Sequence, residues 1–388
     1  MIVSQPVSPI PDGRRPPRRP RVLSILLLLG VVIGGCASRP GSLELAPTAG
    51  AVPGATPVIV LVATDRAPDG VQQVGYGSGR ASLRYEELTI SIPPGHEPGN
   101  IEWSGETARD ASKSFVVTGR RTLDEAAFKQ TIAMRIGTKG TAGLFAHGYN
   151  YTLTEAVFRV AQLSMDAPSV TVPILFSWPS EAAVTGYVAD RDAAAYARDD
   201  LAHVLEILGG IRTEGTIALA GHSMGAWLVM ETVRQLRLEG RDELIARFEV
   251  ALAAPDIDVD VFRSQLAVVG PLDPPLTILV SKDDRALDAS RRLTGGRLRV
   301  GAADIGDPSL EVIARRQGVR VVDISSVAAS DAARHDRFVR FAMLQASETT
   351  QEGSPLGRVG KVGAFVFNAA GAAVASPFTL AGRALEGE

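Results

Sequence analysis

The sequence predicts an α/β fold in which helices cover both faces of a mostly parallel, doubly wound sheet. From residue 142 onward, short apolar runs rich in β-branched residues alternate with segments of helical spacing. These strand segments are apolar throughout rather than at alternate residues, which is typical of parallel strands buried on both faces. The strand segments before residue 120 have no helix between them, so we expect them to form an antiparallel edge of the sheet.

The predicted elements follow one another in a regular order. Strand segments cover Pro57–Ala63, Arg84–Ile92, Ser114–Thr118, Ala142–Ala146, Val170–Trp178, Thr216–Ala220, Phe248–Ala253, Leu276–Ser281 and Gly318–Ile324. Helical segments cover Leu123–Ile136, Thr152–Met165, Asp192–Leu208, Ala226–Leu238, Val259–Leu266, Ala286–Leu293 and Asp336–Gln345. No segment of linker composition divides residues 57–347, which predicts one domain, and no insertion is long enough for a large lid.

The N-terminus has the pattern of an export signal. An arginine-rich segment precedes the apolar run Val22–Ile33, which is too short to span a bilayer. Ile33-Gly34-Gly35-Cys36 resembles the lipobox of bacterial lipoproteins, in which the cysteine is diacylated and becomes the mature N-terminus, and Cys36 is the only cysteine. We expect residues 1–36 to be a signal peptide with a lipobox. Because Ala37 is not the aspartate that retains such proteins in the inner membrane, we expect a lipid anchor in the outer membrane, facing the periplasm.

Composition predicts the character of the two flanking segments and limits the possible ligands of the chain. Residues 37–56 are rich in Ser, Pro, Gly and Ala, which predicts a flexible tether, and residues 348–388 form an apolar C-terminal extension. A net charge of −3 and an aromatic content of 5% give no indication of nucleic-acid binding. No His, Asp or Glu cluster has the spacing of metal ligands, so we expect neither metal nor cofactor.

One sequence motif indicates a catalytic residue. Gly221-His222-Ser223-Met224-Gly225 follows an apolar strand segment and opens a helical one. Gly-x-Ser-x-Gly in this context is typical of the nucleophile elbow of α/β-hydrolases, a sharp turn that exposes the serine hydroxyl. A Cβ at Gly221 or Gly225 would clash with the neighbouring strand or helix. We therefore predict Ser223 as a nucleophile.

A serine nucleophile needs a base, and the base needs an acid to orient it. In α/β-hydrolases the order along the chain is serine, acid, histidine, and His335 is the only histidine after Ser223. The acid should follow a strand between these two residues. Asp283 and Asp284 follow one such strand, and the spacing does not choose between them. Asp256, Asp258 and Asp260 follow the preceding strand and are rivals, although capping of the next helix is their expected role.

The oxyanion of an acyl-transfer intermediate needs N–H donors. One donor is expected from Met224, the residue after the nucleophile, and another from the loop that follows the strand Ala142–Ala146. That loop begins His147-Gly148-Tyr149-Asn150. Gly148 lets the backbone turn its amides inward, so the Tyr149 N–H is the second predicted donor, with His147 and Gly148 as supporting residues.

At these residues the chain resembles the bacterial α/β-hydrolases of the esterase/lipase superfamily that form a domain of unknown function. The shared segments within residues 57–345 are Ala63–Arg66, Ile90–His96, His147–Asn150, Phe176–Ser180, Gly221–Gly225 and Ser281–Leu287. The resemblance implies that Asp284 rather than Asp283 is the acid, and it supports His335. It implies no particular substrate.

The sequence thus predicts a lipid-anchored serine hydrolase that cleaves a carboxylic ester, or less readily a thioester or amide, through an acyl-serine. The expected partners are a small-molecule or lipid ester and the membrane. Two alternatives stay open: acyl transfer to an envelope lipid or glycan, and a non-catalytic envelope scaffold or binding protein built on the same fold. Trp178-Pro179-Ser180, Tyr187 and Asp190 follow the strand beside the elbow and either line the substrate pocket or form a packed loop.

Overall fold

The structure is a computed structural model that describes residues 39–48, 52–69, 74–104, 109–306, 314, 316–349 and 366–368. The chain divides into two units, Met1–Arg39 and Pro40–Glu388, and the described helices and strands belong to the second. The predicted signal peptide and Cys36 lie outside the described residues, as does most of the predicted C-terminal extension. No helix in the described part of the chain combines the length and apolar composition needed to cross a bilayer.

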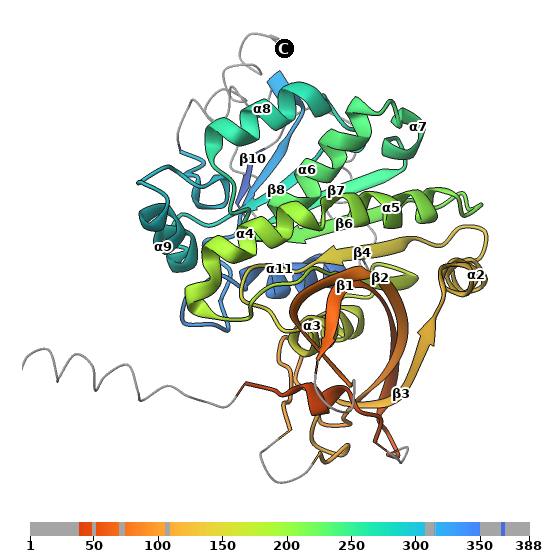
Figure 1. The fold of residues 1–388 in the computed structure, drawn as a ribbon. Helices are drawn as coiled ribbons and strands as arrows, with labels where there is room; N and C mark the ends of the chain where they lie inside the picture. Colours follow the sequence, from red (N-terminus) through yellow and green to blue (C-terminus); the bar gives the residue numbers. More distant parts are fainter. Residues whose placement is uncertain are drawn as a thin grey trace, which may run out of the picture. The chain divides into compact units, whose positions relative to one another are not determined.

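A single sheet of ten strands organises the second unit (Figure 1). The strands are β1 (Thr56–Asp69), β2 (Gly75–Ile92), β3 (Val116–Leu123), β4 (Ala142–Ala146), β5 (Val172–Ser177), β6 (Ile217–His222), β7 (Phe248–Ala253), β8 (Thr277–Val280), β9 (Arg320–Asp323) and β10 (Val366–Asn368). Their order is β10-β9-β8-β7-β6-β4-β5-β1-β2-β3. All pairs from β10 to β1 are parallel, and only β1–β2 and β2–β3 are antiparallel. The predicted mostly parallel sheet with an antiparallel N-terminal edge is confirmed.

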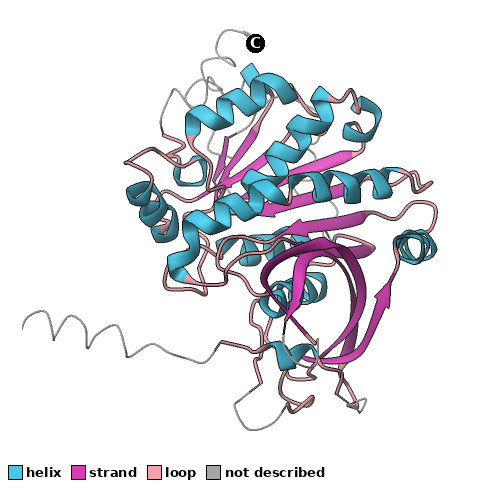
Figure 2. Ribbon diagram, viewed as in Figure 1, coloured by secondary structure: helices cyan, strands magenta, loops and turns pink. Residues whose placement is uncertain are grey.

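Helices cover both faces of this sheet (Figure 2). They are α2 (Glu125–Ile136), α3 (Leu153–Asp166), α4 (Tyr187–Tyr196), α5 (Arg198–Gly209), α6 (Met224–Leu238), α7 (Asp242–Ile245), α8 (Val259–Val269), α9 (Arg285–Leu293) and α11 (Arg337–Thr349), with short 3-10 turns η1 (Ser42–Leu45), η2 (Val184–Gly186) and η3 (Val300–Ala302). No large lid is evident among these elements. The predicted doubly wound arrangement is confirmed.

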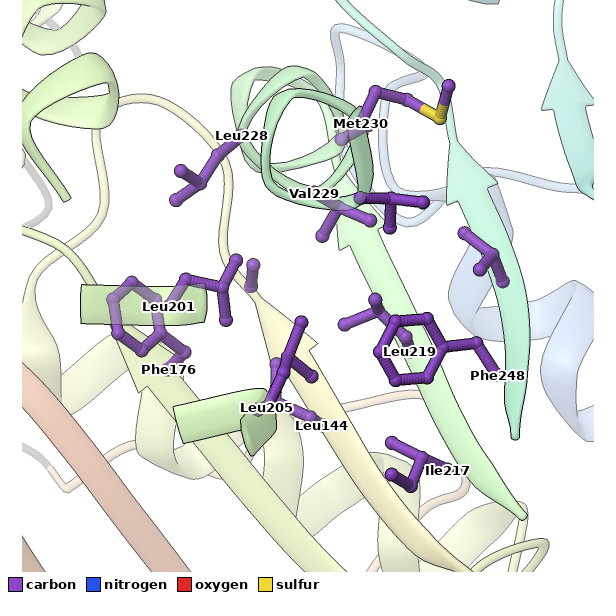
Figure 3. Packing of buried hydrophobic residues seen from close by; sticks show 14 of the residues in the cluster. Leu144, Phe176, Leu201, Leu205, Ile217, Leu219, Leu228, Val229, Met230 and Phe248 are labelled. Carbon is purple, nitrogen blue, oxygen red and sulfur yellow. The ribbon is translucent and has the colours of Figure 1, made fainter. Parts of the chain in front are cut away.

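The core has two layers because successive strand residues point to opposite faces. Leu144 of β4 faces a cluster that α5 and α6 cover, and Figure 3 shows Leu201, Leu205 and Val229 among the side chains of this cluster. The next residue, Phe145, faces the opposite cluster, which α3 and α11 cover. This alternation of two apolar faces explains why the parallel strands read as continuous apolar runs.

The hairpin β1–β2 is longer than predicted. The sequence predicted strands only over Pro57–Ala63 and Arg84–Ile92, whereas pairing continues to Asp69 and Gly75 across two register shifts. Many side chains in this extension are half-buried or exposed, particularly in β2. The extension therefore lacks the apolar signal from which strands are predicted.

The predicted helix Asp192–Leu208 is two helices, α4 and α5. Ala197 separates them with φ −73° and ψ −6°. Neither glycine nor proline stands at the break, so composition gives no sign of it. The earlier start of α4 brings Tyr187 and Asp190 onto its first turn.

Candidate active site

Ser223 lies in a strained turn between β6 and α6. Its φ is 55° and its ψ −118°, in a region that non-glycine residues rarely adopt. The Ser223 N–H donates to the carbonyl of Ala253 at 2.9 Å, and its carbonyl accepts from the N–H of Asp256 at 3.1 Å. Hydrogen bonds to the end of β7 and the following loop thus hold the strained residue on both sides.

The two glycines of the motif are required by close backbone approach. A Cβ at Gly221 would lie 2.6 Å from Cα of Ala226 in α6, and a Cβ at Gly225 would lie 2.3 Å from the carbonyl oxygen of His147. Real Cβ atoms do not approach backbone so closely. These distances agree with the clash that the sequence predicts for a side chain at either glycine. Because both positions lack a Cβ, β4, β6 and α6 can approach one another closely at Ser223.

His335 is bound to Asp284. The imidazole Nδ1 donates to Oδ2 of Asp284 at 2.7 Å, and the Asp284 side chain is 1% exposed. The other carboxylate oxygen accepts from the N–H of Leu287 at 3.0 Å as the N-cap of α9. Since Nδ1 carries the proton in this contact, Nε2 of the neutral ring is left as the basic nitrogen.

The charge around His335 favours its protonated form. Burial alone would lower the pKa of His335, but the hydrogen bond to Asp284 and the negative charges of Asp284, Asp256 and Asp331 raise it above its ordinary value. The pair can therefore accept a proton and stabilise the resulting imidazolium.

The loop that carries His335 lies against the end of β6. The ring of His222, the residue before Ser223, lies 4.5 Å from the His335 ring, centroid to centroid. Nε2 of His222 is 3.2 Å from the backbone carbonyl of His335, to which it donates. Burial lowers the pKa of His222 well below its ordinary value, so this histidine is a neutral support. Sequence reasoning assigned His222 no contact with His335.

Asp283 has different partners from Asp284. It binds Arg337 through both of its carboxylate oxygens, one of them at 3.0 Å from Nη2, and it also binds Arg334. Hydrogen bonds from Arg337 hold the pKa of Asp283 far below its usual range. The geometry brings Asp284, and not Asp283, into contact with His335.

The rival aspartates serve other purposes. Asp258 caps α8 by accepting from the N–H of Asp260 at 2.9 Å, as expected, and Asp260 is exposed. Asp256 instead accepts from the hydroxyls of Tyr187 at 2.9 Å and Ser290 at 2.6 Å, and it pairs with buried Arg299 at 3.2 Å. Sequence reasoning missed this cluster, because its members come from four separate segments and share no local motif.

The loop after β4 passes directly beside Ser223. A Cβ at Gly148 would lie 3.0 Å from Cβ of Ser223 and 2.9 Å from Nδ1 of His222. Met224, the first residue of α6, follows the serine directly and is buried. The backbone at Gly148 and the N-terminus of α6 therefore lie next to Ser223, where a helix N-terminus favours negative charge.

Trp178, Ser180 and Asp190 form a packed loop and not the wall of a substrate pocket. All three are fully buried. The prediction that they follow the strand beside the elbow is wrong, because β4 lies between β5 and β6. Within the described ranges, no group of three His, Cys, Asp or Glu side chains is placed to hold a metal ion.

The sheet order and the elbow define an α/β hydrolase. A family model described as "Alpha/beta hydrolase of unknown function (DUF900)" matches residues 124–351, which is more than half of the chain. The chain belongs to this family. The matched range contains Tyr149, Ser223, Asp284 and His335. No curated protein matches the chain.

Solved structures that are similar to this chain at low scores include the following three. The chain described as "Crystal structure of ESTFA (FE-lacking apo form)" is 12% identical with a TM-score of 0.33, over 84% of this chain and 97% of that one. An esterase of Pyrobaculum calidifontis is 13% identical with a TM-score of 0.28, over 69% and 81%. A "Bacterial Heroin Esterase" is 13% identical with a TM-score of 0.27, over 94% and 88%. At these scores the likeness carries no argument about substrate.

Proposed function

We propose that this chain is a serine hydrolase that cleaves carboxylic esters, or thioesters, through an acyl-serine intermediate. The single observation that carries the proposal is the 2.7 Å hydrogen bond between His335 and Asp284, on a loop that packs against the residue preceding Ser223. Ser223, Asp284 and His335 follow one another in the order of a serine, the orienting acid and its base, and the acid is hydrogen-bonded to the base.

The proposed reaction has two steps. Nε2 of His335 takes the proton of the Ser223 hydroxyl while Oγ attacks the carbonyl carbon, and the N–H groups of Met224 and Tyr149 stabilise the oxyanion. The intermediate collapses when His335 returns the proton to the leaving alcohol, which leaves an acyl-serine. Water then attacks the acyl carbon and gives a proton to His335. As the bond between the acyl carbon and Oγ breaks, His335 passes this proton to Oγ, which releases the carboxylic acid and regenerates Ser223.

A fluorophosphonate probe tests the proposal. The folded protein should form one adduct, located by mass spectrometry on Ser223, and Ser223→Ala should form none. The same substitution should abolish hydrolysis of short-chain p-nitrophenyl esters and leave the thermal unfolding midpoint nearly unchanged. An unlabelled, inactive wild-type protein would favour a non-catalytic scaffold, and an active Ser223→Ala variant would overturn the nucleophile assignment.

The pH profile provides a second check. Because the pKa of His335 is raised, acidification protonates the ring, and so removes the neutral base, at a pH above the ordinary histidine pKa of about 6.5. We expect kcat/KM to fall on acidification through an apparent pKa above that value. A lower limb well below pH 6 would contradict the assignment of His335.

We also propose that the enzyme is exported and anchored in the bacterial envelope through lipid on Cys36. The support is the basic segment, the apolar run of Val22–Ile33 and the lipobox-like residues before the only cysteine. An anchored ester hydrolase would meet lipid or small-molecule esters in the periplasm.

A further inference from the structure

The loop His147–Tyr151, which carries the proposed oxyanion donor Tyr149, is fixed by buried side chains. Its backbone groups are held in turn along the loop. Three side chains donate to carbonyls of the loop: Trp178 Nε1 to that of His147 (2.8 Å), His147 Nδ1 to that of Gly148 (2.8 Å) and Arg66 Nη2 to that of Tyr151 (2.7 Å). Two side chains accept from N–H groups of the loop: Asp190 Oδ2 from that of Asn150 (3.1 Å) and Ser180 Oγ from that of Tyr151 (3.3 Å). These side chains come from β1, the loop after β5 and α4, as well as from the loop itself.

Arg66 lies at the centre of this arrangement. It is 1% exposed, and its Nε donates to Oγ of Ser177 at 3.0 Å. Nη1 donates to the carbonyls of Gly77 at 3.1 Å and Ser180 at 3.0 Å. Burial lowers the pKa of Arg66 to about 10, which keeps the guanidinium charged. Its rigid fork can hold several oxygens at fixed angles, which a lysine cannot.

Asp190 holds the other side of the loop. The carboxylate is fully buried and accepts from the Asn150 N–H, from the Ser180 hydroxyl at 2.6 Å and from the Glu181 N–H at 2.6 Å. Asn150 has a φ of 62°, so the backbone next to Tyr149 is held in a left-handed conformation by this contact. Arg66 and Asp190 both bind Ser180, through its carbonyl and its hydroxyl.

His147 links the network to the loop as a neutral ring. Burial, and then the charge of Arg66, lower the pKa of His147 to about 3. Nδ1 must carry the proton because it faces the Gly148 carbonyl, and Nε2 lies 3.1 Å from the Ser177 hydroxyl and 3.4 Å from Nη2 of Arg66. Only this tautomer satisfies every contact.

We propose that Arg66 and Asp190 are positioning residues for catalysis, which hold the Tyr149 N–H where the oxyanion of the intermediate develops. The proposal rests on the proposed function. Its physical reason is that oxyanion donors are effective only when they are fixed in advance, since reorientation during the reaction costs free energy. A displacement of about 1 Å can lower the rate about 100-fold.

The test compares transition-state and substrate recognition in Asp190→Asn. The N–H₂ group of the amide would replace one carboxylate oxygen, face at least one of the three donors and loosen the loop. We expect kcat/KM for a short-chain ester to fall about 100-fold with little change in KM. A trifluoromethyl ketone, which forms a tetrahedral adduct with an oxyanion, should lose affinity by the same factor. The pKa of the pH profile should not move, because His335 and Asp284 lie outside the network.

Glu86→Gln is the matched control. Glu86 is a buried carboxylate in β2 that binds Arg120 at 2.7 and 2.8 Å and Tyr76 at 2.6 Å, with no contact to the loop. This variant should lose thermal stability and keep its kcat and ketone affinity. If Asp190→Asn behaves like Glu86→Gln, losing stability with unchanged kcat and ketone affinity, the positioning role is overturned.

A second variant keeps the test decisive if Asp190→Asn does not fold. Ser180→Ala removes the hydroxyl that joins Tyr151 and Asp190, and it should lower kcat/KM and ketone affinity in parallel by a smaller factor. Unchanged values in a folded Ser180→Ala protein would also overturn the proposal. A wild-type protein that neither hydrolyses esters nor binds the ketone would instead overturn the proposed function itself, and this inference with it.

Discussion

At the scale of single residues, two adjacent aspartates differ entirely in their surroundings. Asp284 is buried, caps α9 and binds His335, whereas Asp283 is 37% exposed at its side chain and pairs with Arg334 and Arg337. Successive residues at the start of a helix point in different directions, so neighbouring carboxylates meet different partners. The chemistry of the site therefore depends on a one-residue register.

This difference predicts opposite effects of two conservative substitutions. Asp284→Asn should lower kcat about 10,000-fold, because the amide no longer favours the tautomer with a free Nε2. Asp283→Asn should change kcat far less and should lower thermal stability, because it weakens the pairing with Arg337. Ester hydrolysis and thermal unfolding of the two variants check this, and the reverse ranking would move the acid to residue 283.

At the scale of elements, one buried histidine joins the loop after β2 to α3. Nδ1 of His96 lies 2.8 Å from Oε2 of Glu102, and Nε2 lies 2.9 Å from Oδ1 of Asp166 at the end of α3. Both ring nitrogens face carboxylates, so both are donors and the ring is cationic. Burial lowers the pKa of His96, but the hydrogen bonds and charges of Glu102 and Asp166 raise it above its ordinary value.

His96→Gln should therefore destabilise the protein in a pH-dependent way. A histidine with a raised folded-state pKa adds stability that is fully present below its unfolded pKa and is lost as the pH rises through the folded-state value. We expect a loss of roughly 1–3 kcal/mol at pH 6 and a smaller loss at pH 9. Denaturant unfolding at both pH values measures it. His203→Gln, at an exposed pair with Glu125, is the control and should change little.

At the scale of the whole molecule, the parallel arrangement of the strands brings the candidate site residues together. The Gly148 loop follows β4, Ser223 follows β6, Asp284 follows β8 and His335 follows β9. The carboxyl ends of parallel strands lie at one edge of a sheet, where ligands bind in open α/β folds. Segments up to 187 residues apart in the chain (148 to 335) thereby converge without any local signal that pairs them.

The proposed anchor predicts where the whole molecule resides. In a Gram-negative host, Cys36→Ser should release the protein from washed membranes into the soluble fraction, because no diacylated residue remains. Ala37→Asp is the matched control, since it keeps the lipid and should shift the protein from the outer to the inner membrane. Cys36→Ser protein that stays membrane-bound would contradict the anchor and direct attention to the C-terminal extension.

The order and type of most elements could be predicted from the sequence, because the periodicity of apolar residues is a local property. The sequence also located the elbow at Ser223 and left His335 as the one histidine in the expected order. The predicted element boundaries were wrong where packing, and not composition, determines where an element ends. The two cases are the half-exposed extension of β1–β2 and the break between α4 and α5.

The partners that side chains share could not be predicted and became evident only in the folded chain. From spacing alone Asp283 and Asp284 were equivalent, and the family resemblance favoured one; the contact with His335 depends on a loop 51 residues later in the chain. The sequence placed Arg66 in a segment shared with the family and Asp190 in a pocket or packed loop, but it connected neither to the loop His147–Tyr151, because they act on backbone 85 and 40 residues away. Hydrogen bonds between buried groups form only when the fold brings distant segments together, and no local pattern encodes them.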